Sequence, residues 1–412
     1  MEKPIAIVMG GTSPHILLVD KLHKRGFYVI LIDFLDNPPA KRVADEHIKE
    51  STLDKEKVLE IAQERHAQLV ISACTDQTNS VCCYVAEKLG LPHPYSYQTS
   101  LCVTDKGLMK RIMVDNGIPT SSFTTTDSIE TIDWSRIEFP AVVKPVDCNS
   151  SKGVRRVDSV EETKQRVTEA ISLSRTKTAI IEGFNRGEEI QVDCLSTEND
   201  VKVVMTRQKQ KIASHGNDMV LQSFGSIFPA PLSKELQVQA QEIANGIAKA
   251  FGLKNTPFFY QAIVTDEGIK VLEFAPRIGG GLSYYMLNEF ANYDAIEYMI
   301  DSYLGNPLRY EPNNGKGFQS TMLLYMNSGT FDHIFGLAEL QEKGVVYETF
   351  VMKTKGDVVD GDMRSSNRVA AFVVQGDSYD ELKRKEKLAI EEIEIFDNDN
   401  KPLLNRQIYS TL

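Results

Sequence analysis

Apolar runs alternate with amphipathic, helix-like segments over the first hundred residues. The apolar runs cover 5–10, 28–33 and 68–73, and the helix-like segments cover 15–26, 56–67 and 78–90. Continuous apolar strands separated by amphipathic helices are typical of a parallel sheet that is covered on both faces. The pattern therefore predicts an α/β domain with a parallel sheet over residues 1–104.

The pattern changes after residue 104. A helix ending in glycine over 105–117 is followed by an extended exit, and strand signals then outnumber helix signals. Strands are expected over 141–146, 154–159, 178–184, 189–196, 201–208, 258–265 and 269–275, with helices over 160–174 and 234–252. The last two strands are joined by the short turn Asp-Glu-Gly at 266–268, which is a hairpin signal. The section 105–305 is predicted to be α+β, built around antiparallel pairs.

The remainder, 306–412, predicts a small appended α+β unit. Its strands are expected over 317–327, 345–353 and 368–376, and its helix over 378–393.

Composition and charge narrow the class of protein. The 412 residues are 42% hydrophobic and 25% charged, and the net charge is −11. A chain of this length is longer than one hydrophobic core usually supports, so two or three domains are expected. The acidic balance disfavours nucleic acid or an anionic membrane as the main partner.

Targeting signals and cysteine spacing favour a cytoplasmic protein. No apolar run approaches the ~20 residues of a membrane span, and the N-terminus is interpreted as a first strand rather than a signal peptide. The scattered cysteines have no CxxC spacing, so they predict neither a zinc site nor a disulfide framework; they are Cys74, Cys82, Cys83, Cys102, Cys148 and Cys194.

The turn over 10–15, Gly-Gly-Thr-Ser-Pro-His, stands between the first strand and the first helix. Backbone N–H groups in such a turn could hold an anion. The turn lacks the GxGxxG spacing, and no acidic residue follows the second strand in a way that fixes a ribose, so dinucleotide binding is disfavoured.

Two lysines are candidates for contact with phosphate. Lys106 begins a helix after Asp105, a residue suited to capping it. Lys144 lies in the otherwise apolar run Ala-Val-Val-Lys-Pro-Val, where a buried lysine needs an anion. The alternative is that Lys144 faces solvent from an edge strand, which Pro145 would mark.

Two connecting segments could contact a nucleotide. The polar loop 147–153, which contains Ser150, Ser151 and Gly153, could place N–H and hydroxyl groups along phosphates. In 180–190, Glu182 ends a strand, the following backbone could pair with an adenine edge, and a carboxylate could accept both hydroxyls of a ribose.

The stretch 271–281, Val-Leu-Glu-Phe-Ala-Pro-Arg-Ile-Gly-Gly-Gly, places charge among apolar residues and glycine. Across the predicted hairpin, Gln261 and Glu273 can point to one face and give oxygen ligands to a cation such as magnesium. Arg277 would then offer a fork for phosphate or carboxylate, and glycines 279–281 would let a substrate approach the backbone. A local Glu273–Arg277 ion pair is the alternative.

The order of these features resembles the ATP-grasp superfamily. The matching features are a lysine after Asp before a helix ending in Gly-Ile-Pro, a strand lysine followed by a small-residue loop, a Glu-rich hinge and E-x-x-x-R after a two-strand acidic site. The resemblance implies a Rossmann-like pre-ATP-grasp domain over 1–104, an ATP-grasp domain over 105–305, and a lid over 306–412 similar to the C-terminal domain of biotin carboxylase.

The resemblance also implies roles for individual residues. Lys106, Lys144 and the loop residues Ser150, Ser151 and Gly153 would contact the ATP phosphates. Adenine would lie against Glu182, Gly183 and Phe184, with Glu189 on the ribose. Gln261 and Glu273 would hold Mg²⁺ or Mn²⁺. Arg277 would steady an acyl-phosphate. Arg207, a second catalytic candidate, stands where relatives often have a lysine near the phosphates, and Gly279, Gly280 and Gly281 would line the substrate site.

One departure from the family pattern concerns the metal. Many members have Asn two residues after the metal-binding Glu, whereas this chain has Ala275. The metal would then have one side-chain ligand fewer and depend more on phosphate and water.

The glycine-rich end of this stretch and the short phosphate loop are more similar to the amino-acid ligases of the superfamily. The leading hypothesis is therefore an ATP-dependent ligase that joins a small carboxylate to an amine, with no nucleic acid or membrane partner. A bicarbonate-activating carboxylase, a ligase of a nucleotide pathway and a catalytically silent nucleotide-binding module are the alternatives. The resemblance is also compatible with a homodimer.

Overall fold

The computed structural model describes residues 3–148, 152–212, 222–312, 317–363 and 367–412. The chain separates into two compact units, the first comprising Met1–Gly187, Gln191–Met205 and Leu232–Asn313 and the second Glu188–Ile190, Thr206–Pro231 and Asn314–Leu412. The predicted division into domains at 104/105 and 305/306 remains a prediction, and the two units are described separately below.

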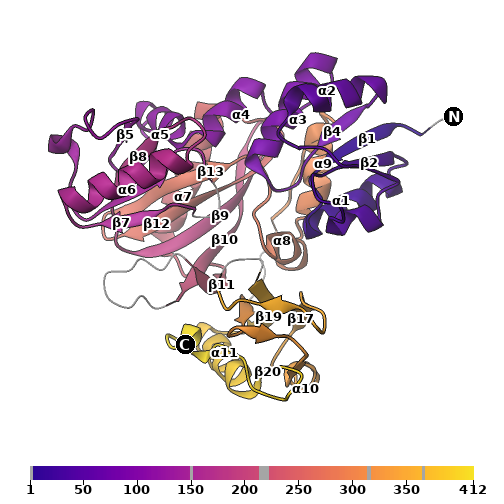
Figure 1. Ribbon diagram of the computed structural model, residues 1–412, viewed down its shortest axis with the longest axis vertical. Coiled ribbons are helices and arrows are strands. Elements are labelled where there is room, and N and C mark those ends of the chain that lie inside the picture. The colour runs from indigo at the N-terminus through magenta and orange to yellow at the C-terminus, as the bar shows by residue number, and fades with distance from the viewer. Residues whose placement is uncertain (1–2, 149–151, 213–221, 313–316, 364–366) are drawn as a thin grey trace. The chain divides into compact units, whose positions relative to one another are not determined.

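The first unit begins with the predicted parallel sheet, whose strands are ordered β3-β2-β1-β4. The strands are β1 (Ile5–Met9), β2 (Tyr28–Ile32), β3 (Glu46–Ile48) and β4 (Leu69–Ile71). Helix α1 (Ser13–Lys24) lies on one face, and α2 (Lys55–Glu64) and α3 (Asp76–Leu89) lie on the other (Figure 1). Strands β1, β2 and β4 are almost entirely buried, as the continuous apolar runs predict, whereas the residues of β3 are half-buried.

A four-stranded sheet of order β5-β8-β6-β7 follows, with antiparallel pairing throughout. Its elements, with the helices before and after them, are α4 (Tyr97–Thr104), α5 (Lys106–Asp115), β5 (Phe123–Thr126), β6 (Ala141–Pro145), β7 (Arg155–Val157), α6 (Val160–Leu173) and β8 (Ala179–Gly183). Asp105 caps α5 as predicted, accepting a hydrogen bond of 2.9 Å from the N–H of Leu108. Strand β6 lies inside this sheet, with β8 and β7 on either side.

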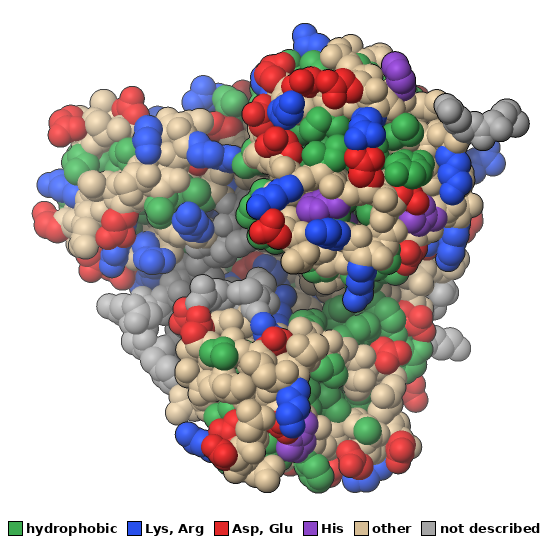
Figure 2. Space-filling model, turned by 45° about the vertical axis from the view of Figure 1, so that its right-hand side comes forward, with side chains coloured by type: hydrophobic (Ala, Val, Ile, Leu, Met, Phe, Trp, Pro, Cys, Tyr) green, Lys and Arg blue, Asp and Glu red, His purple; other side chains and the backbone are tan. Residues whose placement is uncertain are grey.

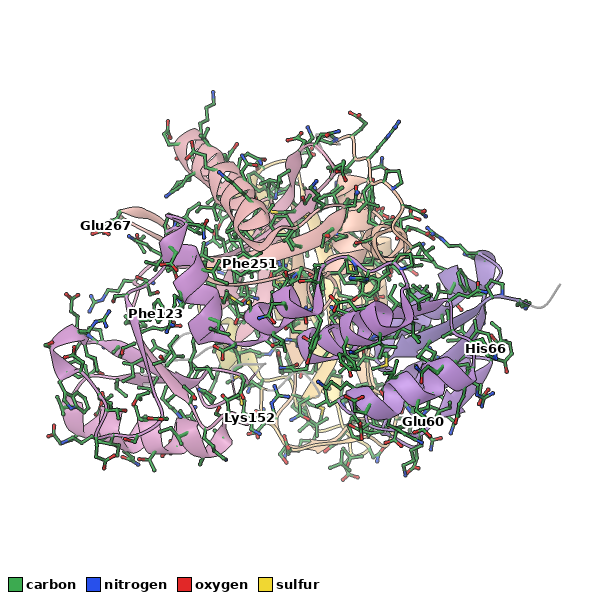
Figure 3. The ribbon with its side chains drawn as sticks, turned by 90° about the horizontal axis from the view of Figure 1, so that it is seen from above. Glu60, His66, Phe123, Lys152, Phe251 and Glu267 are labelled. Carbon is green, nitrogen blue, oxygen red and sulfur yellow. The ribbon has the colours of Figure 1, made fainter. Side chains whose placement is uncertain are left out.

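The larger sheet of the first unit has neighbouring strands in the order β13-β12-β9-β10. The elements are β9 (Glu188–Ser196), β10 (Val201–Lys211), α7 (Lys234–Phe251), β12 (Thr256–Thr265), β13 (Gly268–Ala275), α8 (Ser283–Ala291) and α9 (Ala295–Tyr303). Helix α7 packs on this sheet, and the rings of Phe251 and Phe274 have centroids 4.3 Å apart. Glu267 marks the tip of the β12–β13 hairpin in Figure 3.

The second unit is an antiparallel sheet with helices. The later residues of β10 pair with β11 (Ser223–Phe228), and β14 (Phe318–Tyr325), β19 (Arg368–Gly376) and β17 (Glu348–Val351) continue the order. The remaining elements are α10 (Leu337–Glu342), α11 (Tyr379–Glu392), and two small pairs, β15 (Gly329–Thr330) with β18 (Val358–Val359) and β16 (His333–Phe335) with β20 (Glu394–Phe396).

The hydrophobic core of the first unit joins segments that are distant in sequence. Ile278, which follows the Arg277 position, shares one cluster with the strands of the parallel sheet and with Ile296 and Met299 of α9. The chain after β13 therefore packs back onto the N-terminal sheet, which brings residues near 277 to the parallel strands.

The distribution of charge on one face and the character of the helices can be described directly. On the face shown in Figure 2, Lys and Arg side chains lie among Asp and Glu side chains instead of forming a broad basic patch. Within the described residues, no helix has the length and apolar character needed to cross a membrane.

Gly187 is a position where any side chain should destabilise the first unit. It has φ +145°, and an added Cβ would lie 1.9 Å from the carbonyl oxygen of Val264. Because backbone cannot move aside as a side-chain end can, Gly187→Ala should lower the free energy of unfolding by about 3 kcal/mol, measured by urea denaturation. Gly280→Ala is the control, since its Cβ would meet nothing within 4 Å. Equal stability of both variants would contradict the assigned packing.

Candidate active site

Lys144 and Glu182 form a buried ion pair on adjacent strands. Val142 pairs with Glu182 between β6 and β8, so Lys144 and Glu182 lie diagonally on the same face of the sheet. The Lys144 Nζ lies 2.9 Å from Glu182 Oε1, and their side chains are 10% and 3% exposed. Lys144 is therefore a buried lysine in an interior strand, and the alternative of a solvent-facing edge position is wrong. Figure 3 labels Phe123 of β5, the residue paired with Glu182 from the other side.

A third charged group, Lys110 of α5, completes this cluster and was not anticipated from the sequence. Its side chain is fully buried, with Nζ 3.5 Å from Glu182 Oε1. Nζ also donates a 2.7 Å hydrogen bond to the hydroxyl of Thr120. Thr120 in turn donates to the carbonyl of Val271 at 2.7 Å. The only sequence signal for Lys110 was its place on the apolar side of α5, with Gly107 and Met113.

The pKa values of the cluster follow from burial and pairing. Burial lowers the pKa of Lys110 to about 8, although the charge of Glu182 opposes the shift. Burial alone would raise the pKa of Glu182, but Lys110 and Lys144 outweigh it and lower the pKa. Glu182 is therefore ionised near neutral pH, and Lys110 still carries its proton there.

Lys106 lies between the phosphate-loop candidate and the metal-site candidate. Its Nζ donates to the carbonyl of Cys148 at 2.9 Å and lies 3.6 Å from Glu273 Oε2. Within the predicted loop, Ser150 and Ser151 lie outside the described residues. Gly153 is described, with φ +76°, and a Cβ there would lie 2.8 Å from Leu173 and 3.0 Å from Pro145.

The hinge after β8 has its first two N–H groups already bonded. The N–H of Gly183 donates to the carbonyl of Ser122 at 2.9 Å, and that of Phe184 donates to Pro140 at 3.2 Å. An adenine at this hinge would therefore not find a donor at these two positions, and the nearby acceptor is the carboxylate of Glu182.

Gln261 and Glu273 are directly opposite each other in the β12–β13 register. Directly opposed residues point to the same face, so the hairpin brings the two side chains together as predicted. Ala275, two residues further, is 4% exposed and brings no polar atom. The described residues contain no group of three or more His, Cys, Asp or Glu that could hold a metal. A cation between Gln261 and Glu273 would therefore need further oxygen ligands, such as those of phosphate and water.

Arg277 is held by an aspartate from the N-terminal sheet region. Its Nε lies 2.5 Å from Asp76 Oδ1 and its Nη2 lies 2.7 Å from Asp76 Oδ2, while Nη1 donates to the carbonyl of Ile278 at 3.0 Å. The guanidinium also lies over the ring of Phe259, 5.2 Å from its centroid. The carboxylate that Arg277 bonds is therefore Asp76, while the nearby charge of Glu273 also helps to raise the pKa of Arg277.

Arg277 retains the ability to bind an anion. A guanidinium has five N–H donors, and three are used in the contacts above. Among the described residues, none of these contacts uses the other two donors, on Nη1 and Nη2, and the side chain is 13% exposed. Burial would lower the pKa of Arg277, but Asp76 outweighs it, so the group is a permanent cation. Beside it, Gly279 is buried, whereas Gly280 and Gly281 are exposed.

Glu189 and Arg207 belong to the second unit. Both carboxylate oxygens of Glu189 pair with lysines, Oε1 with Lys209 and Oε2 with Lys211. The guanidinium of Arg207 is largely buried and lies 5.9 Å from the centroid of the Phe228 ring. The roles of Glu189 at a ribose and of Arg207 in catalysis remain predictions from the resemblance.

The glycine turn after β1 is engaged within the protein. The N–H of Gly11 donates to Asp33 Oδ2 at 2.7 Å, and Asp33 comes directly after β2. The Asp33 carboxylate already accepts the hydrogen bond of the Gly11 N–H, which a bound anion would need, so the turn is disfavoured as an anion site. His15 is buried with its ring near Thr12 and Ser72, and burial lowers its pKa to about 4.

Comparison with known proteins identifies the central part of the chain. Residues 104–281 match the family described as phosphoribosylglycinamide synthetase, ATP-grasp (A) domain. The chain is 23% identical over 265 residues to formate-dependent phosphoribosylglycinamide formyltransferase of Rhodococcus jostii, covering 62% of this chain and 64% of that protein. It is 22% identical over 290 residues to the L-arginine-specific L-amino acid ligase of Bacillus subtilis, covering 69% of each.

A solved structure confirms the fold. The L-amino acid ligase from Bacillus licheniformis aligns with a TM-score of 0.80 and 20% identity, covering 97% of this chain and all of that one. At this identity the likeness shows the fold alone. The predicted combination of an N-terminal parallel sheet with an ATP-grasp fold is confirmed.

Asp76 and Arg277 should depend on each other for stability. Asp76→Ala and Arg277→Met should each lower the free energy of unfolding by about 3 kcal/mol, because each leaves a largely buried charge without its partner. The double variant should lose clearly less than the sum of the two, as urea denaturation would measure. Glu198→Ala, which removes the acidic member of an exposed ion pair, is the control and should change little. Additive losses would show that the two residues do not stabilise each other.

Lys110 should make stability depend on pH in the alkaline range. Its pKa is about 8 in the folded protein and ordinarily 10.5. Between these values the unfolded chain binds more protons, so this group makes stability rise with pH, and below about pH 8 it has no slope. The unfolding free energy of wild type minus that of Lys110→Met should therefore increase from pH 8 to pH 10. If this difference in unfolding free energy stays constant from pH 8 to pH 10, the pKa of Lys110 in the folded protein is not lowered to about 8.

Proposed function

The central part of this chain, residues 104–281, is an ATP-grasp domain, and from this premise we propose that the protein is an ATP-dependent carboxylate–amine ligase. Its substrates would be ATP, a small carboxylic acid or amino acid, and an amine. The products would be the amide, ADP and phosphate.

One observation carries the proposal. The opposed Gln261 and Glu273 lie beside Lys106, while Arg277 follows on the same strand exit with two N–H donors left. Oxygen ligands, a lysine and an arginine fork in one place suit a transfer of phosphate charge from ATP to a carboxylate.

The nucleotide would lie between the two sheets of the ATP-grasp domain. Lys106 and Lys144 would contact its phosphates, with Ser150, Ser151 and Gly153 of the loop above them. Adenine would lie along Gly183 and Phe184, and its amino group would donate to Glu182, an ionised acceptor.

Gln261 and Glu273 would hold Mg²⁺ or Mn²⁺ together with phosphate oxygens and water. When bound, the metal would neutralise phosphate charge and orient the γ-phosphate for transfer.

The chemistry divides into two displacements. A carboxylate oxygen of the first substrate attacks the γ-phosphorus, the bond to the β-phosphate oxygen breaks, and ADP leaves. The amine nitrogen then attacks the acyl carbon, the carbon–oxygen bond to phosphate breaks, and the nitrogen loses a proton. Arg277 would hold the acyl-phosphate oxygens through both steps, and positioning with charge neutralisation suffices without a covalent nucleophile.

Amino-acid substrates are the first class to test. The fold similarity to an L-amino acid ligase and the sequence similarity to an L-arginine-specific one support them. Gly280 and Gly281 are exposed beside Arg277 and would let a substrate approach the backbone. We also propose a cytoplasmic enzyme, and a homodimer remains part of the proposal by analogy with the fold.

The test is release of phosphate from ATP with Mg²⁺ and a pool of the twenty amino acids, followed by mass spectrometry of the products. A new amide mass with stoichiometric ADP supports the proposal. Phosphate release that requires bicarbonate instead of an amine would indicate a carboxylase. ATP binding without turnover in these pools and with added carboxylates and amines would indicate a silent module.

Glu273 and Arg277 should separate binding from chemistry. Arg277→Met should leave ATP binding nearly intact while turnover falls about a hundredfold, because its remaining donors act on the transferring group. Glu273→Gln should instead raise the magnesium concentration needed for half-maximal turnover. Isothermal calorimetry with an ATP analogue and the phosphate assay measure the two effects. Wild-type turnover in both folded variants would contradict the assigned roles.

A further inference from the structure

We infer that Lys110 is a positioning residue that holds Glu182 as a fixed carboxylate and thereby makes the site prefer adenine over guanine. The inference rests on the proposed ATP site. It adds Lys110 as a determinant of base specificity that acts through Glu182 and would not contact the nucleotide.

The contacts around Glu182 are asymmetric. Lys110 and Lys144 both approach Oε1, at 3.5 Å and 2.9 Å. Oε1 is the nearest carboxylate oxygen to both lysines, and these contacts are ion pairs to a buried atom. Two cations beside one carboxylate hold it in a single orientation, and its two oxygens, with about four lone-pair sites, can still accept from a ligand.

Lys110 is itself held in place. Its Nζ donates to Thr120 at 2.7 Å, and the Thr120 hydroxyl donates onward to the carbonyl of Val271. The N–H of Val271 in turn donates to the carbonyl of Pro119 at 2.8 Å. Lys110 is thus linked through Thr120 to strand β13, and its side chain is fully buried.

The two lysines differ in what they can do when a nucleotide binds. Lys144 is proposed to contact phosphate, so its charge is shared between ligand and Glu182. Lys110 is fully buried and bonded to Thr120, so its charge stays with Glu182. With a pKa of about 8, it remains a cation at neutral pH. Glu182 therefore keeps one counter-charge at neutral pH in the nucleotide-bound protein.

Base selectivity follows from the charge of Glu182. The exocyclic amino group of adenine donates a hydrogen bond, whereas guanine presents a carbonyl oxygen at the same ring position. An ionised carboxylate can only accept, so it binds the amino group and repels the carbonyl. A carboxylate that lost its counter-charge would move or take up a proton, and a protonated carboxyl can donate to guanine.

The experiment is calorimetric titration of the full chain with non-hydrolysable analogues of ATP and of GTP in Mg²⁺ at pH 7. Lys110→Met should weaken binding of the ATP analogue roughly tenfold and reduce the preference for it over the GTP analogue by a similar factor. Arg111→Met is the matched control, because it removes a positive charge from the next, exposed position of α5. It should leave both affinities unchanged.

A double-variant cycle shows whether Lys110 acts through Glu182. Glu182→Gln should weaken the ATP analogue and lose the base preference, and adding Lys110→Met should cause no further loss. Additive losses, or an unchanged base preference in Lys110→Met, would overturn the inference. If Lys110→Met alone does not fold, the comparison of Glu182→Gln with the double variant still decides, since that pair removes both opposite charges together.

These measurements do not need the carboxylate or the amine. Failure to form an amide, with wild-type preference for the ATP analogue intact, would overturn the ligase proposal and leave the inference standing. If the wild-type protein binds neither analogue, the nucleotide site and the role of Lys110 are both overturned.

Discussion

A buried carboxylate must be paired, and Glu182 is paired with lysines from two other elements. Burial would raise its pKa and favour the neutral acid, but Lys110 and Lys144 reverse that tendency. Removing Glu182 would leave two buried lysines without a counter-charge, which is far more costly than never having built the cluster. Most of the candidate site depends on this pairing, because the elements that carry the three charges also carry its other parts.

The three charges fix the relative placement of their elements. Strands β6 and β8 must pair so that Lys144 and Glu182 share a face. Helix α5 must pack against that face so that the Nζ of Lys110 reaches Glu182. Lys106 begins the same helix, so placing Lys110 also places Lys106 near Glu273. The hydrogen bonds through Thr120 reach β13, two residues before the proposed metal ligand. One buried cluster thus links a proposed adenine acceptor, a phosphate lysine and a metal-site strand.

Local patterns in the sequence predicted most of these elements. The helix expected over 378–393 is α11 (Tyr379–Glu392), and the strand expected over 368–376 is β19. The hairpin turn at 266–268 also predicted the right neighbours, so the placement of Gln261 beside Glu273 follows from the sequence alone. Such predictions succeed where period, capping residue and turn chemistry all lie within a few residues.

Those local patterns did not predict contacts between residues that are distant in sequence. Arg277 is 201 residues from Asp76, and Asp76 resembles an ordinary first-turn acid of a helix. Lys110 is one of several charged residues in α5, and only the packed structure shows that it is inside. Strand β11 and the helices α4, α8 and α9 were also not anticipated; their stability depends on packing rather than on a strong local signal.

The Asp76–Arg277 pair fixes an arginine for which a role in the reaction is proposed. A free arginine side chain would lose rotamer freedom on meeting its ligand, and the loss would oppose binding. Here Asp76, the Ile278 carbonyl and the Phe259 ring already fix the guanidinium. The remaining two donors point in a set direction before any substrate arrives, so little reorganisation is left for the reaction step. Because Asp76 begins α3, a residue of the N-terminal region orients an arginine within the stretch 104–281 that matches the ATP-grasp family model. In the proposed reaction, the first hundred residues would therefore help to position the group that holds the acyl-phosphate.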